Sequence, residues 1–285
     1  MRYCITLSYD GSSFSGWQIQ PNAPSVQETL ERAISLVLRS KVSVTGAGRT
    51  DTGVNAISYV AHFDSPEPLR EEEFACKLNA ILPLSVMIHE VKLVADDFHA
   101  RFDARLRRYN YFLHRKKDPF MGAYSYLCTY ALDVAAMNEA CKVLIGTHDF
   151  SCFEKTGGNS KTSICTIFEA GWKPYIPTHV SIMDYPSAMK YPGAPGSGVL
   201  ETYAPKHQTP VASQGQRAWG DYLVFTVSAD RFLRNMVRAI VGTLLDIGRG
   251  RYPVSHMAEV LASGDRSAAG ESVPGHALFL SKVEY

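Results

Sequence analysis

One aspartate and one arginine lie two positions apart on a segment that three glycines make open and sharply turned. The segment reads Gly46-Ala47-Gly48-Arg49-Thr50-Asp51-Thr52-Gly53. Glycine allows positive φ and close approach of a ligand or another backbone. A carboxylate on such a loop can act as a nucleophile or as a general base. Asp51 is therefore the candidate catalytic acid and Arg49 a candidate substrate-binding residue, although composition alone also fits a structural turn.

The loop does not fit the common cofactor motifs. An aspartate stands where a dinucleotide fingerprint has its third glycine, and no Gly-Lys-Ser/Thr end of a phosphate loop follows. A small-molecule enzyme that holds a phosphate on this loop would place that phosphate beside the negative charge of Asp51. We therefore expect no nicotinamide, flavin or other small-molecule cofactor.

The sequence of the loop resembles the signature of the tRNA pseudouridine synthase A (TruA) family, Gly-Ala-Gly-Arg-Thr-Asp-Ala-Gly-Val-His-Ala. This chain has Thr52 for the alanine and Asn55 for the histidine. Other stretches similar to the family follow in order along nearly the whole chain: Tyr9-Asp10-Gly11, Gly16-Trp17-Gln18, Leu82-Pro83, Phe98-His99-Ala100-Arg101-Phe102, Arg108-Tyr109 and Met236-Val237-Arg238. Near the end, Ala277 replaces the usual glycine, and Cys165 stands where the family often has arginine.

The resemblance implies an isomerase that converts uridine to pseudouridine at positions 38, 39 and 40 of the tRNA anticodon arm. It implies Asp51 as the nucleophile, Arg238 as the active-site arginine, no cofactor, no metal, and a homodimer whose shared cleft holds the RNA. Whether Asp51 attacks the base or the ribose C1′ stays open. The alternative is a non-catalytic RNA-binding or RNA-folding protein of the same architecture, which would have no use for an acid facing RNA.

Three side chains are expected to work together in this chemistry. A target base must be flipped out of its stack, and an aromatic face then stabilises it. The family pattern places that tyrosine after an Arg-Arg pair, which selects Tyr109 over Tyr111 on the same strand face. A carboxylate withdrawn from water stays ionised when a cation is close, so we expect Arg238 to form a bidentate ion pair with Asp51.

A basic stretch from Arg101 to Lys117 holds seven Arg or Lys residues against one acid, with aromatic residues between them. Cations mixed with aromatic rings suit phosphate contact and base stacking, although a solvated strand face gives the same pattern. The candidate RNA-backbone residues are Arg101, Arg105, Arg107, Arg108, Arg115, Lys116 and Lys117.

Bulk properties limit the remaining classes of protein. The chain has 285 residues, 46% of them apolar, and a formal net charge of +1. Its six cysteines form no Cys-x-x-Cys pair, so neither a zinc site nor a disulfide framework is expected. No signal peptide and no membrane-spanning run is recognisable. The expected location is the cytoplasm.

The elements that must position these residues follow a repeated order. Hydrophobic periodicity predicts strand, helix, strand, strand, helix and strand at 2–9, 25–40, 42–45, 56–64, 70–81 and 85–94. The order partly recurs as strand 106–114, helix 133–144, strands 162–173 and 221–229, helix 231–247 with Asp230 as N-cap, and strand 278–284.

This order predicts an α+β protein of two ferredoxin-like halves with antiparallel sheets, at 1–104 and 105–285. The pseudouridine synthase fold, with a central RNA-binding cleft, is what the resemblance implies. Residues 174–216 hold seven of the fifteen prolines and are predicted to be an irregular insertion of unassigned role.

Overall fold

The computed structural model describes residues 1–155, 157, 162–178 and 219–285. In the N-terminal half the strands are β1 (Arg2–Tyr9), β2 (Val44–Gly46), β3 (Asn55–Asp64) and β4 (Val86–Val94), and the helices are α1 (Val26–Leu38) and α2 (Glu71–Ile81). From residue 179 onward, the predicted insertion lies outside the described residues.

In the C-terminal half the strands are β5 (Leu106–His114), β6 (Tyr126–Leu127), β7 (Gly146–Asp149), β8 (Ile164–Pro174), β9 (Tyr222–Ala229) and β10 (Leu278–Glu284). The helices are α3 (Val134–Cys141), α5 (Met236–Gly248) and α6 (His256–Ser263). The short elements β6, β7 and α6 were not predicted.

Among the described residues, one ten-stranded sheet runs through both halves. Its strand order is β4-β1-β3-β10-β5-β9-β8-β7, with β2 paired to β3 and β6 paired to β5. In each half the first, second, third and fourth strands of the repeat lie in the order 4-1-3-2: β4-β1-β3-β2 and β10-β5-β9-β8. Two ferredoxin-like units therefore share the sheet, which confirms the α+β prediction.

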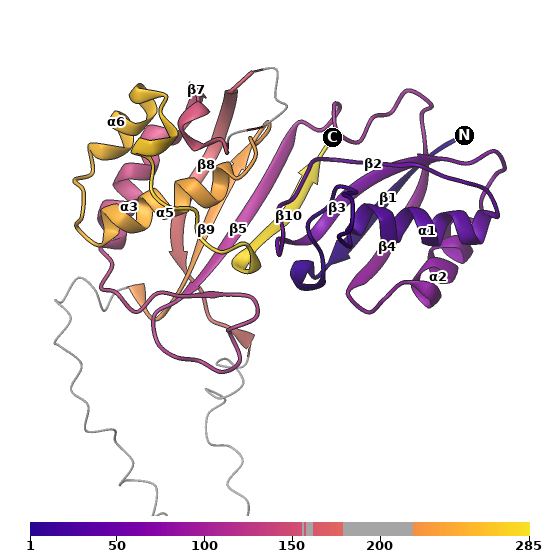
Figure 1. Ribbon diagram of the computed structural model, residues 1–285, viewed down its shortest axis with the longest axis horizontal. Helices are drawn as coiled ribbons and strands as arrows, with labels where there is room; N and C mark the ends of the chain where they lie inside the picture. Colours follow the sequence, from indigo (N-terminus) through magenta and orange to yellow (C-terminus); the bar gives the residue numbers. More distant parts are fainter. Residues whose placement is uncertain (156, 158–161, 179–218) are drawn as a thin grey trace, which may run out of the picture.

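The last strand, β10, joins the two halves (Figure 1). It pairs in parallel with the start of β3, at Asn55 and Ala56, and antiparallel with β5 on its other side. Strand β2 takes the opposite end of the same β3 edge, at Ala61 to Phe63. The loop from β2 to β3, which carries Asp51, therefore lies where the two halves meet. The division at residue 104 remains a prediction.

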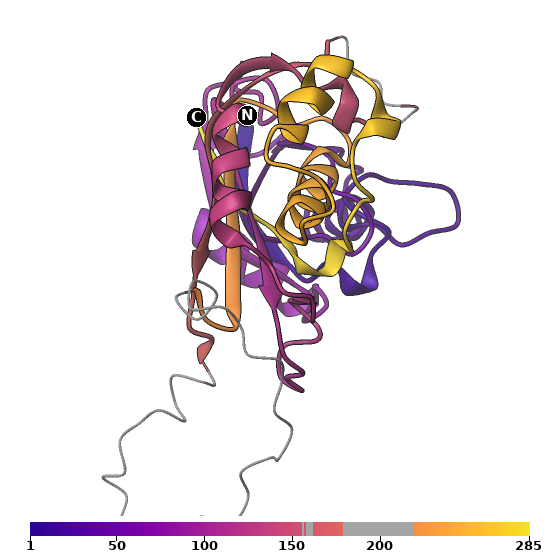
Figure 2. The same ribbon diagram turned by 90° about the vertical axis from the view of Figure 1, so that its left-hand side faces the viewer.

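Each half has its own hydrophobic core. In Figure 1, α1 and α2 lie beside the N-terminal strands, and α3, α5 and α6 lie beside the C-terminal strands. The first core contains Leu7, Leu30 and Phe63, and the second contains Tyr111, Phe225 and Ile240. Both views place the two termini at the same end of the sheet (Figure 1, Figure 2).

Helix α1 begins as the sequence predicts, because the Ser25 hydroxyl accepts a hydrogen bond of 3.2 Å from the Glu28 amide. Helix α5 begins five residues later than predicted, at Met236. Asn235 has a φ of 67°, in the left-handed region, and that conformation separates Asp230 from the helix. Asp230 instead accepts a hydrogen bond of 2.8 Å from the Thr166 amide on β8.

Candidate active site

Asp51 and Arg238 meet at the junction of the two halves. Nη1 of Arg238, on α5, donates to Oδ2 of Asp51 across 3.3 Å, and the arginine and aspartate side chains are 22% and 24% exposed respectively. The contact uses one guanidinium nitrogen, so the predicted bidentate geometry is absent. The Asp51 carboxylate is thus held by a cation while about a quarter of its side chain remains open to a substrate.

The second side of the Arg238 guanidinium is held by the backbone of Val273. Nε donates to the Val273 carbonyl across 2.7 Å, and the Val273 amide donates to the Arg238 carbonyl across 3.3 Å. The segment can approach α5 because Gly242, one turn after Arg238, lacks a side chain: a Cβ there would lie 1.8 Å from the Glu271 carbonyl oxygen. Val273 and Gly242 were not predicted as site residues, because only the folded structure brings the segment to the helix.

The loop around Asp51 rests on buried aromatic side chains. The Trp17 and Tyr59 rings stack with centroids 4.1 Å apart, and the Tyr59 hydroxyl donates to the Gly48 carbonyl. The Thr50 hydroxyl, next to Asp51, lies 2.9 Å from the Tyr9 hydroxyl. These contacts hold the loop in place by packing, and Arg238 holds the Asp51 carboxylate itself.

Asn55, where the family motif has histidine, connects the loop to two distant segments. Its Oδ1 accepts from the Gly11 amide and its Nδ2 donates to the His276 carbonyl, each across 2.7 Å, and the residue is 2% exposed. A side-chain amide offers both a donor and an acceptor. The departure from the motif at Asn55 was visible in the sequence, but its partners were not.

Tyr109 lies on β5, at the boundary between the two hydrophobic cores. Its ring meets Phe232 edge-to-face, with centroids 5.1 Å apart, and it packs against both hydrophobic cores. Burial raises the pKa of Tyr109 to about 12, with Arg107 opposing and the Asp51 carboxylate adding to that rise. The Tyr109 phenol is therefore neutral near pH 7. Phe232 was not among the predicted site residues, although it precedes the Met-Val-Arg motif by only a few residues.

Comparison with known proteins shows the family to which the chain is related. A family model described as tRNA pseudouridine synthase matches residues 5–103 and 140–285. The tRNA pseudouridine synthase A of Parabacteroides distasonis is 43% identical over 285 residues, covering 100% of this chain and 96% of that protein. The protein of the same name from Bacillus subtilis is 36% identical over 289 residues, covering 100% of this chain and 99% of its own.

The chain belongs to the tRNA pseudouridine synthase A (TruA) family. It is accordingly an enzyme, an isomerase of the pseudouridine synthase class. The family model leaves out residues 104–139, where Tyr109 lies, but the match to the Parabacteroides TruA relative spans that stretch.

Of the basic residues predicted to contact RNA in this TruA chain, Arg107 lies inside the protein. It is 9% exposed, and its guanidinium donates to the carbonyls of Ala104, Asp230, Ala47 and Arg101. These four hydrogen bonds occupy the guanidinium, so the prediction that Arg107 contacts a phosphate is corrected. Through its hydrogen bond to the Ala47 carbonyl, Arg107 instead supports the Asp51 loop. Sequence periodicity could not show this, because a strand face does not reveal what lies opposite it.

Two other candidates are paired with acids on the surface. Nη2 of Arg108 lies 3.2 Å from a Glu169 carboxylate oxygen, and Nζ of Lys116 lies 2.8 Å from one of Asp221. Within the described ranges, the remaining candidates form no ion pair with the protein. Of these, Arg49, Arg101, Arg105 and Lys117 are exposed and Arg115 is partly buried.

The described part of the chain holds no group of three His, Cys, Asp or Glu side chains that could bind a metal ion. None of the helices in this part is long and apolar enough to cross a membrane.

Proposed function

We propose that this enzyme isomerises uridine to pseudouridine at positions 38, 39 and 40 in the anticodon arm of tRNA, with Asp51 as the nucleophile. The observation that carries the proposal is the pairing of a partly exposed Asp51 with Arg238, beside the ring of Tyr109. These three residues come from a loop, a helix and a strand that the fold brings together.

Pseudouridine formation breaks the bond between N1 of the base and C1′ of the ribose, and forms a bond between C5 and C1′. The proton lost from C5 and the proton gained at N1 balance, so no redox partner is required. A carboxylate that adds covalently, to the pyrimidine ring or to C1′, divides this exchange into two easier steps. Asp51 is the acid suited to that role, and it can then assist the removal of the C5 proton as a base.

Arg238 holds the Asp51 carboxylate in place, since its Nη1 donates to that carboxylate while its Nε donates to the Val273 carbonyl. A uridine in a stem or loop has to leave its stack before either atom is reachable. The face of Tyr109, whose ring edge is supported by Phe232, then supports the flipped base. Arg49, exposed two residues before Asp51, is positioned by sequence to bind the flanking phosphate.

Exposed basic residues supply further contacts to the RNA backbone. Arg101, Arg105 and Lys117 are exposed, and cations facing solvent contribute to RNA binding by displacing counterions. We further propose a homodimer acting in the cytoplasm, as the resemblance implies. The runner-up function, RNA binding without catalysis, explains the basic surface but gives no role to the Asp51–Arg238 pair.

A tRNA transcript made without modifications distinguishes these functions. The purified protein is incubated with the transcript, and pseudouridine is mapped by chemical labelling and primer extension. We expect labelling at positions 38 to 40, and none in a control transcript with cytidine at these positions. Saturable binding of the transcript without any pseudouridine would support the non-catalytic alternative.

A further inference from the structure

Phe102 is a large apolar side chain exposed to solvent on a loop that the packing holds rigid. The residue lies between β4 and β5 and is 72% exposed. Exposing an aromatic ring to water forgoes the stabilisation that its burial would contribute. An exposed ring on an anchored loop is therefore a candidate binding surface for another molecule.

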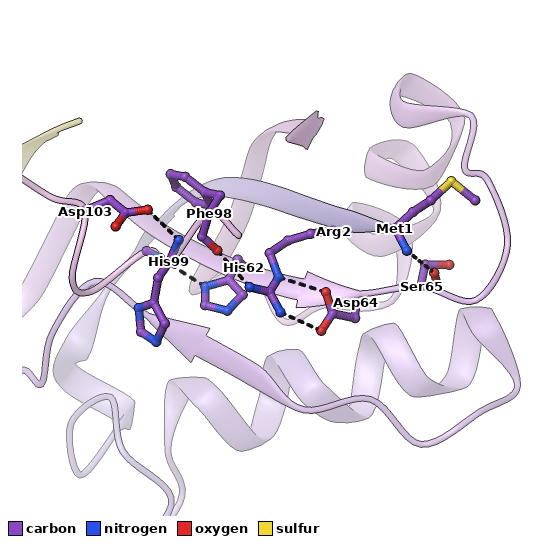
Figure 3. Close-up of polar contacts among 9 residues, drawn as sticks. Met1, Arg2, His62, Asp64, Ser65, Phe98, His99 and Asp103 are labelled. Atoms are coloured by element: carbon purple, nitrogen blue, oxygen red, sulfur yellow. Dashed lines mark hydrogen bonds and ion pairs between the residues drawn. The ribbon is translucent and has the colours of Figure 1, made fainter. Parts of the chain in front are cut away.

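The backbone of this loop is anchored from several sides (Figure 3). Nη1 of Arg2 donates to the Phe98 carbonyl across 3.0 Å while its other nitrogens pair with Asp64. The Ala100 amide donates to Nδ1 of His62 across 3.1 Å, and the Tyr285 hydroxyl donates to the Ala100 carbonyl across 2.8 Å. Each contact comes from a different strand of the sheet or from the chain terminus.

The same loop is joined to the catalytic loop. Nη2 of Arg107 donates to the carbonyls of both Arg101 and Ala47, four residues before Asp51. Ala100 is fully buried and packs with Ala47 in one small apolar cluster. Phe102 is thus held at a fixed position relative to Asp51 by a side chain and by direct packing.

Strand β5 connects the Phe102 loop to the active site. Arg107, Tyr109 and Tyr111 alternate along the strand and therefore share one face. Tyr109 packs against both hydrophobic cores, and Arg107 donates to the Arg101 carbonyl in the Phe102 loop. Arg107 therefore links the Phe102 loop to the strand that carries Tyr109.

The surroundings of the Phe102 ring match the chemistry of nucleic acid. The His99 ring lies beside it, with centroids 4.2 Å apart, and the Arg101 guanidinium carbon lies 5.6 Å from its centroid. Aromatic rings flanked by cations stack on bases and neutralise the neighbouring phosphates. The same loop also exposes Asp96, Asp97 and Asp103, and Asp103 accepts a hydrogen bond of 2.7 Å from the His99 amide. The cation next to the ring itself is Arg101, and a guanidinium at that place suits the phosphate beside a stacked base.

We propose that Phe102 stacks on an unpaired nucleobase of the RNA, at a second position outside the pocket that takes the reacting uridine. This inference rests on the proposed function, since it takes tRNA as the ligand. Phe102 then contributes to holding the anticodon arm in register while the uridine is turned toward Asp51.

Equilibrium binding of an unmodified tRNA transcript tests the proposal, with the full chain carrying Asp51→Asn so that no RNA is converted during the titration. Stacking on one base is worth about 1–3 kcal/mol, which corresponds to about a fivefold to 150-fold change in Kd. We expect Phe102→Leu to weaken binding by about that factor and Phe102→Tyr to restore it. Phe168→Leu, at a ring 51% exposed on β8, is the matched control and is expected to bind as the parent does.

Equal Kd values for Phe102→Leu and Phe168→Leu, with both proteins folded, would overturn the proposal. A change in sedimentation mass for Phe102→Leu would overturn it too, because the ring would then cover a second copy of the chain. Failure of the proposed function is a different result: the parent protein, with Asp51 intact, would bind the transcript and produce no pseudouridine.

Discussion

Asp51 and Arg238 are 187 positions apart in sequence, yet Nη1 of the arginine lies 3.3 Å from Oδ2 of the aspartate. The contact joins a loop of one half to a helix of the other. The active site therefore exists only when both halves are folded and β10 holds them in one sheet. Substitutions in the Val273 segment, which supports Arg238, are therefore expected to lower the rate of pseudouridine formation.

Arg238→Lys keeps the charge but loses the planar guanidinium, which contacts Asp51 and the Val273 carbonyl at once. We expect kcat/KM for pseudouridine formation to fall at least about tenfold, or ~1.4 kcal/mol. Arg234→Lys is the control, since Arg234 is exposed nearby. Equal kcat/KM values for the two variants would reduce Arg238 to a surface charge.

Gly242→Ala adds a methyl group whose carbon would lie 1.8 Å from the Glu271 carbonyl oxygen. Alanine favours a helix over glycine by about 1 kcal/mol, but overpacking costs about 1–3 kcal/mol. We expect a lower free energy of unfolding in urea, together with slower single-turnover catalysis as Val273 shifts from Arg238.

Gly122→Ala is the control for this change, because within the described residues no heavy atom lies within 4 Å of its Cβ position. A Gly242→Ala protein that is more stable than the parent would contradict this, because the backbone at Glu271 would then move away from the added methyl group at no cost in stability.

The two tyrosines on one face of β5 are expected to differ in their roles. Tyr109→Leu removes the ring face beside Asp51, so the single-turnover rate should fall at least about tenfold, while Tyr109→Phe should keep most of it. Tyr111 is fully buried in the C-terminal core, so Tyr111→Ala should lose about 3–5 kcal/mol of stability. Similar single-turnover rates for Tyr109→Leu and Tyr109→Phe would show that stacking is not what the ring contributes.

His62 should make the stability of the protein depend on pH. Burial, with smaller effects from Arg2 and His99, lowers the pKa of His62 from 6.5 to about 4. The unfolded chain therefore binds a proton that the folded chain does not between these values, so the contribution is fully present above pH 6.5 and is lost as the pH falls toward 4.

Urea unfolding at pH 7 and pH 5 measures this effect. We expect His62→Gln to lose less stability than the parent over that interval, while His89→Gln, at an exposed position, behaves as the parent. An unchanged slope in His62→Gln would mean that other groups account for the acid sensitivity.

Much of the fold could be predicted from the sequence, because apolar periodicity is local. Strands β1, β5 and β10 begin and end as predicted, and their alternation is clear. The start of α5 was predicted five residues early, since the left-handed conformation of Asn235 is set by its surroundings. The partner strands of β10 could not be predicted, because pairing depends on the whole sheet.

The candidate site was predictable to the extent that its motifs are. Asp51, Tyr109 and Arg238 were selected from the resemblance, and the structure brings them together. The supporting residues were not found, because Val273 acts through its backbone and Asn55 through contacts with Gly11 and His276. Arg107 was assigned to the RNA because a basic residue on a strand gives no sign of whether it faces inward.

The central claim is that Asp51 is the nucleophile, and Asp51→Asn tests it most directly. The substitution keeps the shape of the side chain but removes its charge and nucleophilicity. Pseudouridine is mapped at positions 38 to 40 of an unmodified tRNA transcript under single-turnover conditions, and binding of the same transcript is measured in parallel. We expect conversion to be lost while Kd changes little, because phosphate contacts elsewhere dominate affinity. Conversion within about tenfold of the unsubstituted enzyme, a barrier change of only ~1.4 kcal/mol, would contradict the account.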